Sequence, residues 1–252
     1  MTTVAGASGR RVLLVEDDAS IARFVEMALE DLGLELTVCV DVESALAALH
    51  EGPVQLIITD LMLPGLSGFD LVDRLHAEPA LLAGAKLVIF SAGIGAGSQE
   101  RLESLGIWRV LRKPASVAQL LACVDEAFAD AADAYAVEAS GRQQEAAPEP
   151  SDSDAIAAYF GGDTALFQAY RAKCLVQFAS DLAVGDAALR TADLPALQRL
   201  AHSLSTVFCT LGWTHDGRTA KTLEGLAAAG DVQASAIAWS SLRVRLLEGT
   251  PT

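Results

Sequence analysis

Short runs of Val, Leu and Ile recur through the first half of the chain, and segments of helical period separate and follow them. Each run is too short for a helix and lacks the polar alternation of a half-solvated strand. Strands that are apolar on both faces are covered by helices on both faces, so the pattern predicts an α/β domain with a doubly wound, five-stranded parallel sheet. The expected strands are residues 12–15, 36–40, 56–59, 86–90 and 107–111.

Polar residues of defined chemistry follow these runs. Glu16 and Asp17 end the first run, Asp60 the third, Ser91 the fourth and Lys113 the fifth. In an open parallel sheet, ligands bind beyond the carboxyl ends of the strands, where all five side chains are expected to meet. An acidic residue at one strand end is commonly a solvated turn residue. Five such groups in register instead indicate a functional site.

The chemistry of this group points to phosphoryl transfer. A carboxylate attacks phosphorus only if its negative charge and that of the incoming phosphoryl group are neutralised together. A Mg2+ ion held by other acidic oxygens supplies that neutralisation, and a Lys amine and a hydroxyl bind the remaining phosphoryl oxygens. The sequence therefore predicts an acceptor of phosphoryl groups that requires Mg2+.

The second half of the chain has a different pattern. We expect a first domain over 8–130, a solvated linker rich in Ala, Glu, Pro and Ser over 131–153, and a helical domain over 154–249. In the last range Leu, Ala and Phe recur at helical spacing, which predicts an all-α antiparallel bundle with a short first helix and four longer ones. The expected breaks between these helices are Gly161-Gly162-Asp163, Gly185-Asp186, Gly212 and Gly230-Asp231.

One helix of this bundle carries a histidine on its polar side. The helix is expected to begin at Thr191 or Asp193. At about 100° per residue, His202 points roughly 160° away from the mean direction of the apolar stripe, so we expect it to be exposed. Ser205 and Thr206 lie near it and leave room for a docking partner. The stripe consists of Leu194, Leu197, Ala201, Leu204, Phe208 and Leu211.

Charge and cysteine usage exclude some classes of partner. The formal net charge is −15 at pH 7, which disfavours binding to nucleic acid or to an anionic membrane surface. No run approaches the roughly 20 apolar residues of a membrane span, and residues 1–11 lack the apolar core of a signal peptide. The four cysteines are scattered, which favours reduced thiols and a cytoplasmic location.

The first domain resembles the receiver domain of bacterial response regulators, which has a flavodoxin-like fold. The matching motifs are Val12-Leu13-Leu14-Val15-Glu16-Asp17-Asp18, Asp60-Leu61-Met62-Leu63-Pro64-Gly65 with Gly68, Ser91-Ala92 and Lys113-Pro114. By this resemblance Asp60 is the phosphoacceptor and Asp17 a direct Mg2+ ligand. Glu16 is a ligand acting through water, and the backbone carbonyl of Met62 completes the protein's share of the metal shell.

The same resemblance assigns roles to the other strand ends and reveals two departures. Ser91 would bond the phosphoryl group, and Lys113 would pair first with Asp60 and then with the phosphate. The family's switch aromatic is replaced by Val110, and Trp108 projects to the same side of the strand. Met62 cannot hydrogen-bond a hydrolytic water, so we expect the phosphorylated aspartate to hydrolyse slowly.

The helical domain resembles a histidine phosphotransfer domain, a class without kinase activity. By this resemblance His202 exchanges phosphoryl groups with a receiver through its neutral imidazole. Ser205 and Thr206 stand where the family usually has Lys and Gly. The matching segments are Tyr159-Phe160-Gly161-Gly162-Asp163, Leu200-Ala201-His202-Ser203-Leu204, Leu211-Gly212, Leu223-Glu224 and Gly230-Asp231.

Two functions follow from these resemblances. In the first, a histidine kinase or phosphotransfer protein phosphorylates Asp60, and His202 exchanges phosphoryl groups with this receiver or with that of another protein. The linker is long enough for the two sites of one chain to meet. In the second, phosphorylation switches a binding module whose helical domain only docks or dimerises. The residues at 205 and 206 favour this rival.

Overall fold

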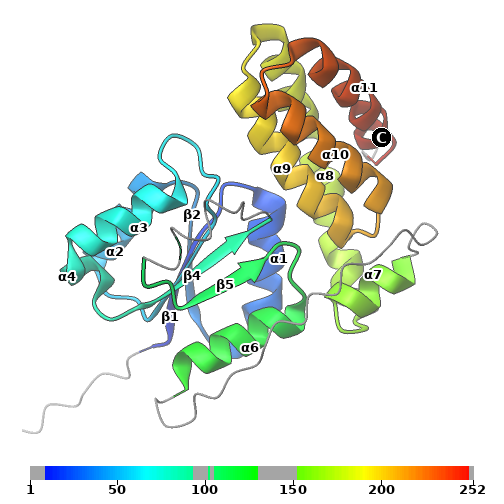
Figure 1. Cartoon of the computed structure of the whole chain (residues 1–252). Coiled ribbons are helices and arrows are strands. Elements are labelled where there is room, and N and C mark those ends of the chain that lie inside the picture. The colour runs from blue at the N-terminus through cyan, green and yellow to red at the C-terminus, as the bar shows by residue number, and fades with distance from the viewer. Residues whose placement is uncertain (1–8, 93–101, 103–104, 130–151, 250–252) are drawn as a thin grey trace, which may run out of the picture.

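The computed structural model describes residues 9–92, 102, 105–129 and 152–249, which form two domains (Figure 1). In the first, five parallel strands lie in the order β2-β1-β3-β4-β5, so the expected doubly wound sheet is confirmed. The strands are β1 (Arg11–Val15), β2 (Glu35–Cys39), β3 (Leu56–Thr59), β4 (Lys86–Ser91) and β5 (Arg109–Arg112).

Helices cover both faces of the sheet because successive strand residues point to opposite sides. Val12 and Leu14 of β1 pack with α1 (Ala19–Leu29) and α6 (Val117–Phe128). Leu13 and Val15 pack on the other face with α2 (Val42–Glu51) and α3 (Gly68–Ala77). The expected helix between the fourth and fifth strands lies outside the described residues except for residue 102. Two short elements, η1 (Glu30–Leu32) and α4 (Pro79–Leu82), complete the described part of the domain.

The second domain has the expected short first helix and four longer ones. Asp193 caps the helix that carries the histidine, since its side chain accepts a hydrogen bond from the amide of Ala196 at 3.0 Å. Most of the predicted linker lies outside the described residues. The helices are α7 (Asp152–Tyr159), α8 (Thr164–Thr191), α9 (Leu194–Thr210), α10 (Thr214–Ala228) and α11 (Val232–Gly249).

One predicted break is wrong. Gly185 and Asp186 lie inside α8, which continues to Thr191. A Cβ atom at Gly185 would lie 2.1 Å from the ring of Trp239, so glycine at this position lets α11 pack closely on α8. Asp186 accepts a hydrogen bond from the same indole at 2.9 Å. These residues make a helix contact and do not form a turn.

One of the two hydrophobic cores is continuous between the domains. Helix α1 packs against α8 and α9, and the strand ends of β4 and β5 point toward the helical domain (Figure 1). The ring of Phe24 on α1 lies 5.4 Å from that of Phe160 and 5.3 Å from that of Tyr170, with edge-to-face geometry. All three rings are buried. The helical domain is therefore docked on the edge of the sheet where the polar strand ends lie.

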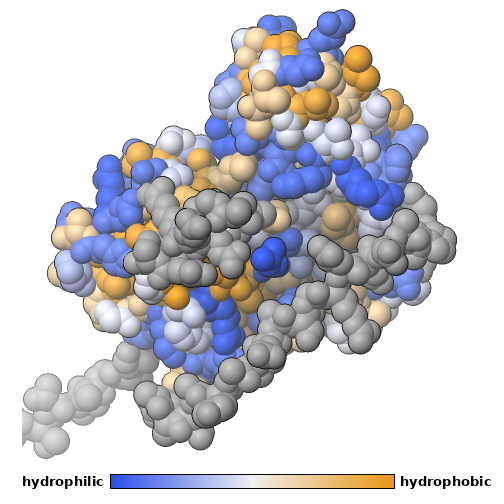
Figure 2. Space-filling model, viewed as in Figure 1, coloured by the Kyte–Doolittle hydropathy of each residue, from blue (hydrophilic) through white to orange (hydrophobic). Residues whose placement is uncertain are grey.

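The described helices include none that is long and apolar enough to cross a membrane. Polar and apolar residues are interspersed on the face of the molecule shown in Figure 2, with apolar patches on both domains. Cys39, Cys123, Cys174 and Cys209 all have free thiols.

Candidate functional site

Three acidic side chains meet at the carboxyl ends of β1 and β3. One oxygen from each of Glu16, Asp17 and Asp60 lies within 4.8 Å of the others. Backbone pairing brings them together, because the Asp60 amide donates to the carbonyl of Val15 at 3.0 Å and continues the ladder between the strands. Hard oxygen donors at this spacing fit a Mg2+ ion. The acidic residues at the ends of these two strands therefore lie together, as the sequence predicts.

Lys113 completes the acidic cluster. Its Nζ donates to Asp60 Oδ2 at 2.8 Å and to Glu16 Oε2 at 2.5 Å, and all three side chains are buried. A buried charge without a partner would cost several kcal/mol, so the ammonium group stabilises the two carboxylates and is itself stabilised. The pairing of Lys113 with Asp60 expected for the unphosphorylated state is observed.

The crowding of carboxylates changes their proton affinities. Burial raises the pKa of Glu16 to about 8, although Lys113 opposes that change. Burial and the charge of Asp60 raise the pKa of Asp17 to about 6. For Asp60 burial also acts upward, but the charge and hydrogen bond of Lys113 outweigh it and hold the pKa below its ordinary value. Asp60 is therefore the carboxylate of the cluster that stays ionised most readily.

The loop after β3 approaches Asp60 closely. The amide of Leu61 donates to Asp60 Oδ1 at 2.5 Å. Gly68 opens α3, and a Cβ atom there would lie 2.0 Å from the backbone oxygen of Asp60. Only glycine fits this contact without moving the chain. Met62 is partly buried beside Asp60, and Ser91 is buried at the end of β4, where its carbonyl accepts from the Lys113 amide at 3.0 Å.

The prediction that His202 is exposed is wrong. Only 4% of the residue is accessible, because the receiver-like domain covers it. Its Nε2 atom lies 4.0 Å from Asp60 Oδ2, and this buried nitrogen has no hydrogen-bond partner among the described residues. A helical-phase argument considers only the helix's own bundle and does not include a second domain. The structure thus places His202 next to Asp60, two residues that the sequence-based prediction assigns to separate domains.

The other imidazole nitrogen contacts a residue that has no role in the sequence-based prediction. His202 Nδ1 lies 3.1 Å from Oε1 of Glu224 on α10. Lys221, one turn earlier, donates to Glu224 Oε2 at 2.8 Å. Glu224 belongs to a motif of the second resemblance, but its neighbour on α9 depends on the register between two helices, which the motif does not reveal.

Val110 occupies the strand position at which receiver domains usually have the switch aromatic. Val110 is 37% exposed. Trp108 packs beneath two cations, with Lys86 Nζ 4.8 Å and Arg109 Cζ 4.6 Å from its ring centre. The ring therefore has a packing role on this face.

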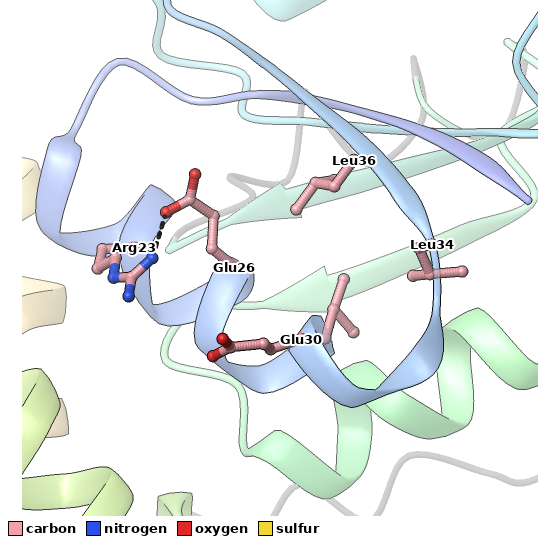
Figure 3. A pocket seen from close by; sticks show the side chains of 6 residues that line it. Arg23, Glu26, Glu30, Leu34 and Leu36 are labelled. Atoms are coloured by element: carbon pink, nitrogen blue, oxygen red, sulfur yellow. Dashed lines mark hydrogen bonds and ion pairs between the residues drawn. The ribbon is translucent and has the colours of Figure 1, made fainter.

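A separate hollow of about 260 Å³ lies between α1 and β2. Figure 3 shows its lining, including the ion pair between Arg23 and Glu26 at 3.1 Å. None of the predicted site residues lines it, so it is not part of the candidate site.

Residues 12–125 match the family model described as response regulator receiver domain. The DNA-binding response regulator MtrA of Mycobacterium tuberculosis is 36% identical over 83 residues, which are 33% of this chain and 35% of that protein. The virulence sensor protein BvgS of Bordetella bronchiseptica is 27% identical over 202 residues, which cover 77% of this chain and 16% of that protein. The chain thus spans about a third of MtrA and less of BvgS.

Solved structures also resemble the first domain. The chemotaxis response regulator CheY4 of Vibrio cholerae is 23% identical with a TM-score of 0.44, covering 48% of this chain and all of that one. The signal receiver domain of a LuxO repressor protein from Vibrio parahaemolyticus is 26% identical with a TM-score of 0.43, covering 47% of this chain and 89% of that one.

Proposed function

We propose that this chain is a phosphorelay protein. The premise is that residues 12–125 are a response regulator receiver domain of the two-component family. Asp60 accepts a phosphoryl group, and His202 of the same chain exchanges that group with it. The observation that carries the proposal is the 4.0 Å distance between His202 Nε2 and Asp60 Oδ2. Receiver domains act with histidine kinases or phosphotransfer proteins, and here the phosphotransfer partner is a domain of the chain itself.

The receiver site supports the first step. Receiver domains bind Mg2+ in an acidic pocket, and the oxygens of Glu16, Asp17 and Asp60 suit that ion. When bound, the ion would neutralise the carboxylates and the incoming phosphoryl group. Lys113 holds Asp60 ionised, and a hydroxyl at Ser91 is available for a phosphoryl oxygen. The backbone carbonyl of Met62 remains the proposed further ligand.

The transfer step requires little rearrangement. The lone pair of His202 Nε2 attacks phosphorus, the bond between phosphorus and the Asp60 oxygen breaks, and Asp60 leaves as a carboxylate that Lys113 neutralises. The reverse step exchanges the same bonds. Water is excluded from this junction, since Asp60 is 2% exposed and His202 4% exposed. Exclusion of water protects both phosphorylated forms during transfer.

The observed distance implies that the domains separate slightly when the site is loaded. A nucleophile in a near-attack arrangement lies about 3–3.5 Å from the atom that it attacks. That distance plus a bond from phosphorus to oxygen exceeds the 4.0 Å between the two side chains. The phosphoryl group therefore fits only after this slight separation, and a donor protein reaches Asp60, which is 2% exposed, only if the domains open further.

The alignment with BvgS gives independent support for a joint function of both domains. It covers 77% of the 252 residues and so cannot fit into the part of the chain before α7. Some of the helical domain therefore aligns with BvgS together with the receiver domain.

The test is to follow phosphate through the full chain. Asp60 is phosphorylated with labelled acetyl phosphate and Mg2+, and the label is divided by its chemical stability. Acyl phosphate at Asp60 is lost in base, whereas phosphate on histidine is stable in base and lost in acid. We expect base-stable label in the wild type and none in His202→Gln. A wild type without base-stable label, with this receiver or any partner receiver, would reject the relay.

The rival function, a phosphorylation-switched binding module, has a specific observation in its favour. Ser205 and Thr206 stand where the family has Lys and Gly, and the docked helical domain buries Asp60. In that function, phosphorylation of Asp60 would release the helical domain and expose a surface for a partner, and His202 would never carry phosphate. The labelling test separates the two functions directly.

A cytoplasmic location stays a prediction from the cysteine usage.

A further inference from the structure

Thr206 on α9 has a buried hydroxyl without a hydrogen bond. The residue is 5% exposed, and its Oγ1 atom has no partner among the residues that the structure describes. In contrast, Thr210, Thr219 and Thr222 of the same domain donate to the carbonyl four residues earlier, at 2.9 to 3.1 Å. Burial of an unpaired polar group costs free energy. The hydroxyl of Thr206 therefore suggests a partner that binds in another state of the protein.

The direction of Thr206 on its helix places it at the domain junction. Four residues turn an α-helix by about 400°, so Thr206 lies one turn after His202 and about 40° around α9 from it. It points almost directly away from the apolar stripe that packs inside the bundle. Helices α1 and α7 pack on α9, and α1 brings the receiver domain against this part of the bundle.

Two neighbours of Thr206 show what this face of α9 contacts. His202 Nε2 lies 4.0 Å from Asp60 Oδ2. The side chain of Ser203 hydrogen-bonds to Asp18, which caps α1 at the acidic end of the sheet. Ser203 lies about 100° around the helix from His202, so the direction of Thr206 falls between these two residues. Helical side chains tilt toward the N-terminus of their helix, so that of Thr206 leans toward His202.

Ser205 also carries a hydroxyl close to His202, but it lies on another side of α9. It is about 60° from His202, in the direction opposite to that of Thr206. A Cβ atom at Gly217 would lie 3.3 Å from the Ser205 backbone oxygen, so this side of α9 packs on α10. Of these two hydroxyls, that of Thr206 is the one directed toward the receiver domain.

Two unpartnered polar atoms, Thr206 Oγ1 and His202 Nε2, thus lie one turn apart on the face of α9 that covers the phosphoacceptor. A phosphoryl group carries three oxygens that accept hydrogen bonds strongly. On the receiver side, Lys113 donates to Asp60 at 2.8 Å and is in place for one of them. A group that moves to Nε2 moves away from Lys113 and toward α9, where a second donor is required.

We propose that the Thr206 hydroxyl donates a hydrogen bond to the phosphoryl group as the group passes between Asp60 and His202, and that Thr206 is a catalytic residue of this transfer. The bond from the Asp60 oxygen to phosphorus breaks while the bond from Nε2 to phosphorus forms. The Thr206 proton stays on its hydroxyl throughout. A donor at this position stabilises the charge on the phosphoryl oxygens. The inference rests on the proposed function of His202 as a phosphoryl carrier.

The experiment uses Thr206→Val, which removes the hydroxyl and keeps the size of the side chain. Asp60 of the full chain is phosphorylated with labelled acetyl phosphate and Mg2+. We expect base-stable label to appear about 10-fold more slowly than in the wild type, as for loss of one hydrogen bond to a charged group, and Thr206→Ser to stay within about twofold of the wild type. Phosphorylation of Asp60, measured as base-labile label in a His202→Gln background, should be the same with Thr and with Val at 206.

Thr210→Val is the matched control. Thr210 lies one turn later on α9 and is 3% exposed, but its hydroxyl donates to the Thr206 carbonyl at 2.9 Å. Its transfer rate should equal that of the wild type. Unfolding of the unphosphorylated proteins in urea gives a second readout. Thr206→Val should be more stable than the wild type because it removes a buried unpaired hydroxyl, whereas Thr210→Val should be less stable because it loses a hydrogen bond.

The possible failures have different signatures. Base-stable label that appears in Thr206→Val at the wild-type rate would exclude donation by the hydroxyl. Faster transfer in Thr206→Gly than in the wild type would mean that the side chain obstructs the phosphoryl group. Lower stability of Thr206→Val would show that the hydroxyl is already bonded in the unphosphorylated protein. A wild type that carries no base-stable label would reject the proposed relay itself, and the role of Thr206 with it.

Discussion

Asp60 and His202 face each other across the domain junction, but they are held in different ways. The partner of Asp60 is Lys113 and its close neighbours are Glu16 and Asp17, all from strand ends of one sheet. His202 is held by Glu224 from a second helix and is buried by the other domain. Asp60 therefore has its hydrogen-bonding partners within its own domain and gains only cover by docking, whereas His202 lies against a group of the other domain and owes part of its burial to docking.

This difference indicates which of the two sites depends on the docking of the domains. The acid pocket should keep its geometry in an undocked chain, because the sheet and the β3 to α3 loop define it. The histidine should lose its neighbour Asp60, its burial and its protection from water as soon as the domains separate. Changes at the pocket, at the junction and near the pocket rim should therefore have effects of decreasing size.

The largest effect is expected from Asp60→Asn, which removes the nucleophilic oxygen and leaves the rest of the pocket in place. Both base-labile and base-stable label should disappear completely, because His202 receives phosphate only through Asp60 in the proposed relay. The measurement is labelling of the full chain with acetyl phosphate and Mg2+. His202→Gln is the complementary variant and should keep the base-labile label. Base-stable label in Asp60→Asn would show that the histidine is loaded without the receiver.

The next effect concerns the junction. Phe24→Ala removes a ring that is 5% exposed and packs on Phe160 and Tyr170. Loss of a buried Phe costs about 3–5 kcal/mol, and here much of that cost falls on docking. We expect His202 to become accessible to an acylating reagent such as diethyl pyrocarbonate and base-stable label to appear more slowly.

Leu71→Ala is the control for this variant. Leu71 is equally buried but belongs to the core on the opposite face of the sheet. It should lower the stability of the receiver domain without changing the reactivity of His202. Equal reactivity of His202 in Phe24→Ala and in the wild type would mean that the aromatic contact does not hold the domains together.

Asp181 on α8 adds a pH dependence to the folded protein. Burial and the charge of Asp18, at the start of α1, raise the pKa of Asp181 to about 7 from 3.8, while a hydrogen bond from Gln177 opposes this change. The folded state then holds a proton that the unfolded state has released. The stabilising contribution is full below the unfolded pKa and is lost as the pH rises through about 7.

Asp181→Asn tests this dependence, since its side-chain oxygen can still accept from Gln177 but does not ionise. Between pH 6 and pH 8, the free energy of unfolding of the wild type should fall by about 1.4 kcal/mol more than that of the variant. Urea unfolding of both proteins at the two pH values measures the gain. A difference between the proteins that is the same at both values would exclude titration of Asp181 in this range.

More of the pocket than of the histidine site could be predicted from the sequence. Uninterrupted apolar runs identified all five strands, and parallel strands necessarily bring their carboxyl ends together, so Glu16, Asp17, Asp60 and Lys113 could be grouped from the sequence alone. The order and number of helices in the second domain also followed from periodicity. These inferences depend on local pattern and on one general rule of sheet geometry.

The failures have tertiary causes. Gly185 suggested a helix end, but the position lies inside α8, where Trp239 of α11 packs so closely that only glycine fits. His202 was expected to face solvent because its own helix places no apolar neighbours around it, and the covering surface belongs to another domain. The contact between Glu224 and His202 depends on the register of α9 and α10. Each of these needs a contact between elements far apart in the chain, which a single sequence does not show.

The smallest expected effect lies at the rim of the pocket, where Met62 is partly buried beside Asp60. An amide side chain at this position could hold a water molecule in line with the phosphoryl group, which a thioether cannot do. In a His202→Gln background, where label leaves Asp60 only by hydrolysis, Met62→Asn should raise the rate of label loss about 2- to 10-fold, the value of one hydrogen bond. Met62→Leu, which has a similar size and no hydrogen-bonding group, should leave the rate unchanged. Because the docked helical domain also excludes water from Asp60, adding Phe24→Ala should increase the effect of Met62→Asn. An equal half-life in Met62→Asn and Met62→Leu would mean that the closed junction alone controls the lifetime of the phosphoaspartate.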